Sequence, residues 1–149
     1  MNLATGDLAA LQQLAARYWA LADLTEDVAL DTLFEPDAVF QLGSLRLDGL
    51  PAIEAFFAER ARTMRSTART TRHLASNFLA MPQGEGEVRI RSTVVVHAGH
   101  DELPLAAGLP SGIADFEDVC RQQQDGSWLY ASRNAQTVFV GPEAASFAR

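Results

Sequence analysis

The hydrophobic pattern of this chain changes its period near residue 70, and this change limits the possible folds more than any other feature. Between Asp7 and Asp23 apolar residues recur every three or four positions and form a stripe on one face of a helix, made of Leu11, Leu14, Tyr18 and Leu21. Beyond the arginine-rich segment 60–72, apolar and polar residues alternate, as in strands whose two faces differ. Helices followed by long strands predict an α+β domain, a cone-shaped α+β barrel with N-terminal helices packed in a strongly curved antiparallel sheet.

Local signals set the expected limits of the other elements in the first half of the chain. Thr25 is a suitable cap for a short second helix, and Pro36 would stop that helix because its ring prevents the preceding residue from staying helical. A hairpin is expected over 38–48, with Gly43-Ser44 in a two-residue type II′ turn. Pro51 fits the first turn of a third helix, where its missing N–H is not needed.

The second half of the chain predicts four strands and one long loop. Asp125-Gly126 is the strongest hairpin signal in the sequence and is expected to join the last two strands. The segment 99–112 holds two prolines and three glycines, which predicts a loop long enough to carry function. The strands are expected at 73–81, 87–98, 113–123 and 127–139.

Composition excludes several classes of protein. The 149 residues are close to the commonest domain size and predict a single domain over 1–149. A net charge of −7 opposes binding to the phosphates of nucleic acid. All twelve basic residues are arginine, which excludes Schiff-base chemistry on lysine and a Walker-type phosphate loop. Cys120 is the only cysteine, so no intrachain disulfide can form. No stretch approaches the roughly 20 apolar residues of a membrane span, and no secretory signal is present, so a cytoplasmic protein without a membrane partner is expected.

Asp23 and His73 are the residues with the clearest chemical potential. A carboxylate that orients a histidine and stabilises its charged form makes that histidine a general base near neutral pH. The structural alternative is a solvated Asp23 near a helix end, because an ideal helical wheel puts it away from the apolar stripe. For His73 the alternative is a histidine that only supports the fold.

Other polar side chains also have two interpretations. Tyr18 is either a packing residue or a hydrogen-bond donor to a substrate oxygen. His97 is either catalytic or part of a solvated outer face. His97, His100 and Asp101 hint at a metal site, but two histidines at this spacing need a further ligand, so no metal is expected. The arginines of 60–72 form either a solvated helix end with weak salt bridges or a guide for an anionic substrate.

Five short segments and the order of the elements carry a family resemblance. The segments are Tyr-Trp-Ala-Leu-Ala-Asp at 18–23, Leu-Phe-Glu-Pro-Asp-Ala-Val-Phe at 33–40, Gly-Leu-Pro-Ala-Ile at 49–53, Arg-His-Leu-Ala-Ser-Asn at 72–77 and Asp-Gly-Ser-Trp-Leu-Tyr-Ala-Ser-Arg at 125–133. With them the chain resembles the SnoaL-like branch of the nuclear transport factor 2 superfamily over almost its whole length. Such a fold hosts enzymes, dioxygenase small subunits and binding modules, so the resemblance indicates fold more strongly than reaction.

The resemblance implies a catalytic role for several residues. Scytalone dehydratase, bile acid 7α-dehydratase and γ-hexachlorocyclohexane dehydrochlorinase share an Asp–His dyad, which Asp23 and His73 match. Tyr18 matches a tyrosine of the bile acid enzyme, and His97 would correspond to a polar side chain on the next strand. This chain lacks the lysine of dehydrochlorinase-like sites, so loss of water fits better than loss of halide. The Asp–Arg–Asp set of epoxide hydrolases and the inner-strand acid of ketosteroid isomerase have no counterpart here.

A cofactor-independent lyase or isomerase is therefore expected, with His73 as base, Asp23 as its partner, and Tyr18 and His97 assisting. Its substrate would be a small hydrophobic alicyclic or aromatic molecule, and no cofactor would be needed. The alternative is a non-catalytic small subunit of a ring-hydroxylating dioxygenase or a hydrophobic-ligand-binding module. A homo-oligomer, dimer or trimer, is expected in either case. Substrate-binding residues would be Trp19, Phe40, Phe57, Asn77 and Arg133.

Overall fold

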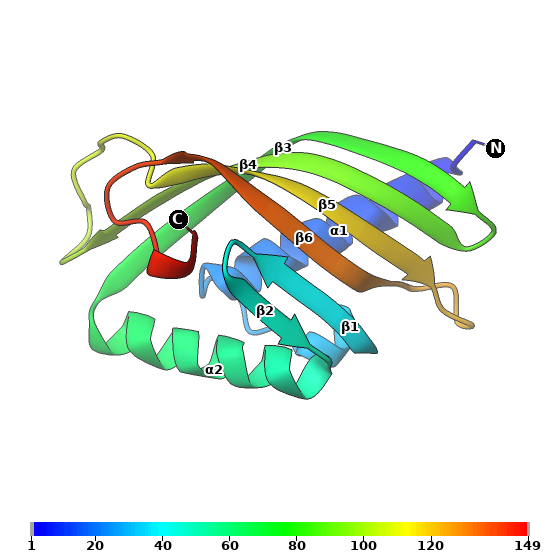
Figure 1. Ribbon diagram of the computed structural model, residues 1–149, viewed down its shortest axis with the longest axis horizontal. Helices are drawn as coiled ribbons and strands as arrows, with labels where there is room; N and C mark the ends of the chain where they lie inside the picture. Colours follow the sequence, from blue (N-terminus) through cyan, green and yellow to red (C-terminus); the bar gives the residue numbers. More distant parts are fainter. Residues whose placement is uncertain (1, 149) are drawn as a thin grey trace.

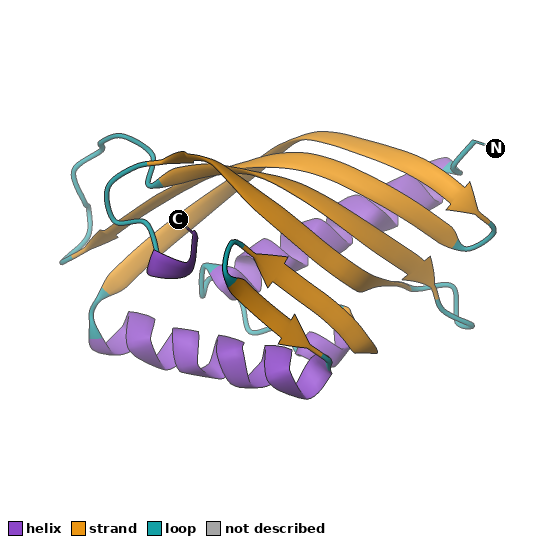
Figure 2. Ribbon diagram, in the orientation of Figure 1, coloured by secondary structure: helices purple, strands orange, loops and turns teal. Residues whose placement is uncertain are grey.

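The computed structural model describes residues 2–148, and in them two long helices accompany one curved sheet (Figures 1 and 2). Neither helix combines the length and the apolar character that crossing a membrane requires. The elements, in chain order, are α1 Thr5–Ala22, η1 Leu30–Thr32, β1 Phe34–Leu42, β2 Leu45–Asp48, α2 Leu50–Ser66, β3 Arg69–Gly84, β4 Glu87–His100, β5 Gly112–Gln122, β6 Trp128–Val140 and η2 Ser146–Ala148.

The six strands form one open sheet in the order β2-β1-β6-β5-β4-β3. All neighbours are antiparallel except β1 and β6, which run parallel. The α+β prediction is confirmed, with two refinements: the sheet is mixed, and its outer strands β2 and β3 do not close it into a barrel. The parallel pair could not be read from hairpin signals, because it joins segments at opposite ends of the chain.

The two helices cover different parts of the sheet. Helix α1 crosses one face of the long strands, while α2 lies beyond the β1–β2 hairpin (Figure 1). Leu11, Leu14 and Tyr18 of the predicted stripe are buried. Leu21 is only partly buried, and the buried face of α1 also includes Trp19 and Ala22. Helix α2 begins just after Gly49, with Pro51 in its first turn as predicted. The core lies between the two helices and the sheet, and from α1 it includes Leu11, Leu14, Tyr18, Trp19 and Ala22.

The prediction of a short helix after Thr25 is wrong. Only a single 3₁₀ turn forms there, and Phe34 already begins β1. Pro36 does not stop a helix; it lies inside β1, in the interval between the register pairs of Phe34 and Val39. A proline without an N–H is tolerated there because the ladder is interrupted at this irregularity.

Strand β3 starts four residues earlier than predicted, at Arg69, so His73 lies inside the strand instead of opening it. The arginine-rich segment is therefore not a connection over its whole length. Its last residues belong to β3 and pair with β4, with Arg69 opposite His100 and Arg72 opposite His97. The strand is then interrupted by an irregularity at which Asn77 has a φ of 55°. At the expected hairpin turn Gly43 has a φ of 56°, and Gly43 and Ser44 together separate β1 from β2.

Candidate active site

Asp23 lies where α1 ends, and its carboxylate faces β3. It is the C-terminal capping residue of α1, and Leu24 after it adopts a φ of 57°, so the chain turns sharply here. The Oδ1 atom accepts hydrogen bonds from Thr71 Oγ1 at 2.8 Å and from His73 Nδ1 at 2.5 Å. Oδ2 accepts a third from the His73 backbone N–H at 2.9 Å. Only 7% of the Asp23 side chain is exposed, so these bonds replace most of its water.

These hydrogen bonds decide the charge of Asp23. Burial alone would raise the pKa of this carboxyl, but hydrogen bonds from the ring and backbone of His73 and from Thr71 outweigh burial and lower the pKa below 3.8. The carboxylate is therefore ionised at neutral pH. An ionised carboxylate accepts the hydrogen of Nδ1, so in the neutral ring the lone pair belongs to Nε2.

His73 is held from a second side by Trp19. The two rings are stacked, with centroids 4.5 Å apart and planes 20° from parallel. Trp19 comes from the last turn of α1 and His73 from β3, so the helix supplies both the carboxylate and the flat surface that fix the imidazole. The imidazole is therefore held in one orientation from two sides.

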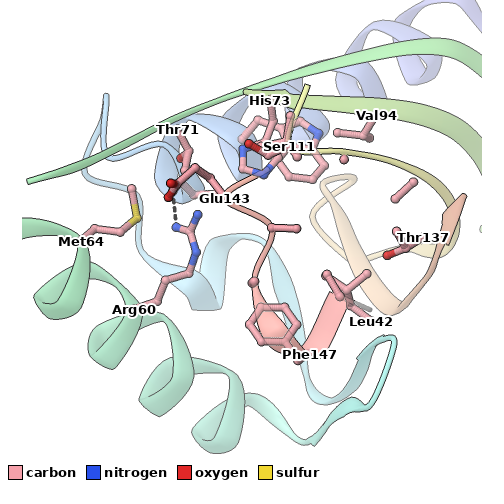
Figure 3. A pocket seen from close by; sticks show the side chains of 18 of the residues that line it. Leu42, Arg60, Met64, Thr71, His73, Val94, Ser111, Thr137, Glu143 and Phe147 are labelled. Carbon is pink, nitrogen blue, oxygen red and sulfur yellow. Dashed lines mark hydrogen bonds between the residues drawn. The ribbon is translucent and has the colours of Figure 1, made fainter. Parts of the chain in front are cut away.

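The dyad borders a cavity of about 550 Å³ whose wall is mainly apolar. The dyad reaches it through His73, close to Thr71 and Ser111 in Figure 3. Of the predicted substrate-binding residues, Trp19, Phe40 and Phe57 line this cavity. The C-terminal residues 143–148 complete its wall, with Phe147 packed on Phe56 and accepting a hydrogen bond from the Ser44 N–H.

Tyr18 lies in the same cavity wall, inside a cluster of aromatic rings. It is 3% exposed. Burial raises the pKa of Tyr18 to about 12, although the positive charges of Arg133 and Arg60 act to lower it. The phenol thus keeps its proton at neutral pH and can donate a hydrogen bond. Packing and donation, the two interpretations from the sequence, are compatible in this position.

A second cavity of about 480 Å³ shares Trp19 and His73 with the first. It lies against the alanine-rich side of α1 and also reaches Asp23 and the side chains of Asp118 and Arg133. The stacked Trp19–His73 pair therefore lines both cavities.

Three predicted site residues do not reach the main cavity. His97 is exposed on β4, and the neighbouring Val96 lines the cavity instead, so the expected alignment was off by one residue. Asn77 is exposed at the irregularity of β3, which turns it away from the face of His73. Arg133 is buried in an ion pair with Asp118 and lies 4.0 Å above the Tyr18 ring, bordering only the second cavity.

The hinted metal site is not formed. Within residues 2–148, no group of three histidine, cysteine or acidic side chains is placed to hold a metal ion. His100 instead contacts Glu143 at 3.2 Å and donates a hydrogen bond from Nδ1 to the Thr67 carbonyl, while His97 lies opposite Arg72 in the β3–β4 pair.

Sequence reasoning missed two polar residues of the site. Thr71 and His73 lie two residues apart in β3, on the same face, and both bind the Asp23 carboxylate. This spacing would have identified Thr71 if the strand had been predicted to start at Arg69. Arg60 stood unresolved among the arginines of 60–72, but it lines the cavity from α2 and donates to the carbonyl of Ala22. Its spacing of three and four residues from Phe57 and Phe56 placed it on the helix face that meets the core.

Comparisons with known proteins agree with this fold. The family described as SnoaL-like domain matches residues 4–134. A search of the curated proteins found no match. Among solved structures, a proposed scytalone dehydratase from Novosphingobium aromaticivorans is 19% identical with a TM-score of 0.75, covering 93% of this chain and 89% of that chain. A proposed aromatic ring hydroxylase from the same organism is 19% identical with a TM-score of 0.77, covering 99% and 100%. LinA is 19% identical with a TM-score of 0.72, covering 94% and 91%.

At such identities the solved structures establish likeness of fold, while the sequence match extends over most of the chain, including both residues of the dyad. The expected family is thereby confirmed, and this chain belongs to the SnoaL-like domain family.

Proposed function

We propose that this protein is a cofactor-independent lyase or isomerase in which His73 removes a proton from carbon. One observation carries the proposal: the Asp23 carboxylate holds His73 Nδ1 at 2.5 Å, at the wall of a mainly apolar cavity. A general base of this kind needs a partner that fixes its tautomer and stabilises the imidazolium as the proton arrives.

The reaction that fits best is loss of water from a hydroxylated ring compound. Nε2 of His73 takes a proton from a carbon next to a carbonyl or ring system, and the C–H electron pair moves toward that group. As the double bond forms, the bond to the leaving hydroxyl breaks, and the imidazolium returns its proton to that oxygen, which departs as water. Tyr18 donates a hydrogen bond where negative charge develops on the substrate oxygen, a bond strengthened by the apolar surroundings.

The same residues can shift a double bond if the proton is returned to another carbon. In both cases the substrate is a small hydrophobic alicyclic or aromatic molecule, because the cavity wall is mainly apolar and rich in aromatic rings. General acid and base groups with charge stabilisation suffice for either step.

The alternative, a non-catalytic dioxygenase subunit or carrier of apolar ligands, receives less support from the site. An apolar ligand can be held by an apolar wall alone. Binding such a ligand does not call for a histidine at the cavity wall whose Nδ1 is held by a buried carboxylate.

The test compares wild type with His73→Ala, using β-tetralone and a β-hydroxycyclohexanone as probes. In deuterated water, wild type should exchange the hydrogens next to the tetralone carbonyl and convert the hydroxy ketone to the enone, followed by NMR and ultraviolet absorbance. His73→Ala should lower both rates by about a thousandfold, within the range for loss of a general base. The exposed His97→Ala is the matched control and should keep the wild-type rates.

Melting temperatures separate chemistry from folding in this comparison. If His73→Ala melts near wild type and loses the reaction, the base is assigned. Two results would contradict the proposal. In the first, wild type acts on neither probe faster than buffer alone; in the second, His73→Ala acts on both probes as fast as wild type.

A further inference from the structure

Two arginines, Arg60 and Arg69, line a cavity whose wall is mainly apolar. Arg69 is paired with Glu143, so the charge to be explained is that of Arg60. Arg60 projects from the cavity side of α2, in the second half of that helix, toward Thr71 on β3 (Figure 3). One of its Nη atoms donates to the carbonyl of Ala22, the residue just before Asp23. This contact holds the guanidinium near the dyad, where Tyr18 and Asp23 are close enough to influence its pKa.

No carboxylate of residues 2–148 forms an ion pair with Arg60, and the neighbouring acids bind other groups. Asp23 uses both oxygens on Thr71 and His73. Glu59 pairs with Arg62, and Glu143 contacts Arg69 and His100. A guanidinium has five N–H donors, so the single bond to Ala22 leaves donors free for a group in the cavity.

Burial makes the unpaired charge of Arg60 energetically unfavourable. Burial lowers the pKa of Arg60, a direction that means the charged form is poorly compensated by its surroundings. A guanidinium still stays protonated in proteins, so the charge remains in the cavity wall. An oxygen anion that enters the cavity would supply the missing partner, and a charged hydrogen bond of this kind is stronger than a neutral one.

We propose that Arg60 binds an anionic oxygen, a carboxylate in the simplest case, carried by the apolar molecule that occupies the main cavity. The ligand is then amphiphilic: its rings lie against Trp19, Phe40 and Phe57, and its anionic group lies at Arg60. Calling this molecule a substrate rests on the proposed function, in which the anionic group would lie on the same side of the cavity as His73. Binding of the anion itself does not depend on that chemistry.

The experiment uses naphthoate and naphthamide, two ligands of the same shape of which only the first is charged. Calorimetric titration of wild type should give a tighter Kd for naphthoate, by about tenfold or more, as expected for a hydrogen-bonded charge. Arg60→Met keeps most of the apolar stem but removes the guanidinium, and it should abolish this preference while leaving the Kd of naphthamide nearly unchanged. Arg62→Met, on the same helix but exposed, is the matched control and should keep the preference.

Two further measurements keep the outcome clear. If Arg60→Met does not fold, Arg60→Lys and the salt dependence in wild type decide: the lysine variant should keep part of the preference, and added salt should weaken naphthoate binding only. His73→Ala should retain the naphthoate preference, so loss of turnover and loss of anion binding can be told apart. The assignment would be overturned if wild type bound both ligands with equal Kd or did not bind naphthoate. It would also be overturned if Arg62→Met lost the naphthoate preference as fully as Arg60→Met.

Discussion

Asp23 is brought to the site by the end of its helix, not by the helix face on which it lies. Along α1 the apolar stripe points into the core, and an ideal wheel would direct residue 23 away from it. The helix stops there, and Leu24 with its φ of 57° reverses the backbone, so the carboxylate meets β3. Three donors from Thr71 and His73 then make burial of the charge tolerable.

This arrangement predicts an acid-sensitive part of the stability. Because the folded-state pKa of Asp23 is lowered below 3.8, its contribution is present at neutral pH and is lost as the pH falls through the folded value. Asp23→Asn should therefore unfold more easily than wild type near neutral pH, and the difference should shrink below about pH 4. Urea denaturation followed by circular dichroism at several pH values measures it.

Asp27→Asn serves as the matched control, because it makes the same chemical change on an exposed side chain just beyond α1. It should cost little stability at neutral pH. A difference between wild type and Asp23→Asn that stays constant from neutral pH to about pH 3 would contradict the role given to these hydrogen bonds.

At the scale of elements, β5 and β6 are joined by a charged pair in the core. Asp118 and Arg133 are direct register partners, and two hydrogen bonds of 2.9 and 3.1 Å connect them. Both side chains are at most 3% exposed. The Arg133 guanidinium also lies within 4.0 to 5.2 Å of four aromatic ring centres, contributed by α1, β5 and β6. The expected substrate-binding arginine thus connects two strands and a helix.

Removing one member of this pair should be more harmful than removing both. Arg133→Met leaves the Asp118 charge buried without a partner and should lower the free energy of unfolding by about 3–5 kcal/mol. The double variant Asp118→Leu with Arg133→Met removes both charges and should recover part of that loss. Urea denaturation of the three proteins gives the comparison. A loss below about 1 kcal/mol in Arg133→Met would mean that water reaches Asp118 and the pair is not a core interaction.

For the whole molecule, the exposed apolar side chains support assembly into a homo-oligomer. Phe139 is 65% exposed at the end of β6, beside the exposed Val138 and Val140. Leu74 and Leu79 are more than half exposed on the edge strand β3. We expect a dimer or trimer in sedimentation velocity runs, with Phe139→Asp shifted toward the monomer and Gln136→Asp, also exposed on β6, unchanged. Wild type that sediments as a monomer at micromolar concentration would refute this.

Much of the fold follows from local patterns, whereas the site depends on contacts that local patterns do not contain. The stripe of α1, Pro51 in α2 and the Asp125-Gly126 turn could be predicted because each acts through its near neighbours. The segment after Thr25 was mispredicted because pairing of β1 with β6 outweighs its helical signals. His97 was misplaced because a shift of one residue moves every side chain of a strand to the opposite face. Arg60 could be told apart from the neighbouring arginines only from the cavity that it lines.

The position of β6 between β1 and β5 has a consequence for how the protein forms. Residues 128–140 are synthesised after all the other strands, yet they connect β1 to β5 and so join the two halves of the sheet. Until they emerge from the ribosome, β1 and β5 each present an unsatisfied backbone edge, which other chains can capture. Folding must therefore wait for contacts that span most of the chain, and such topologies fold slowly. Helper chaperones or low temperature during expression would protect this interval.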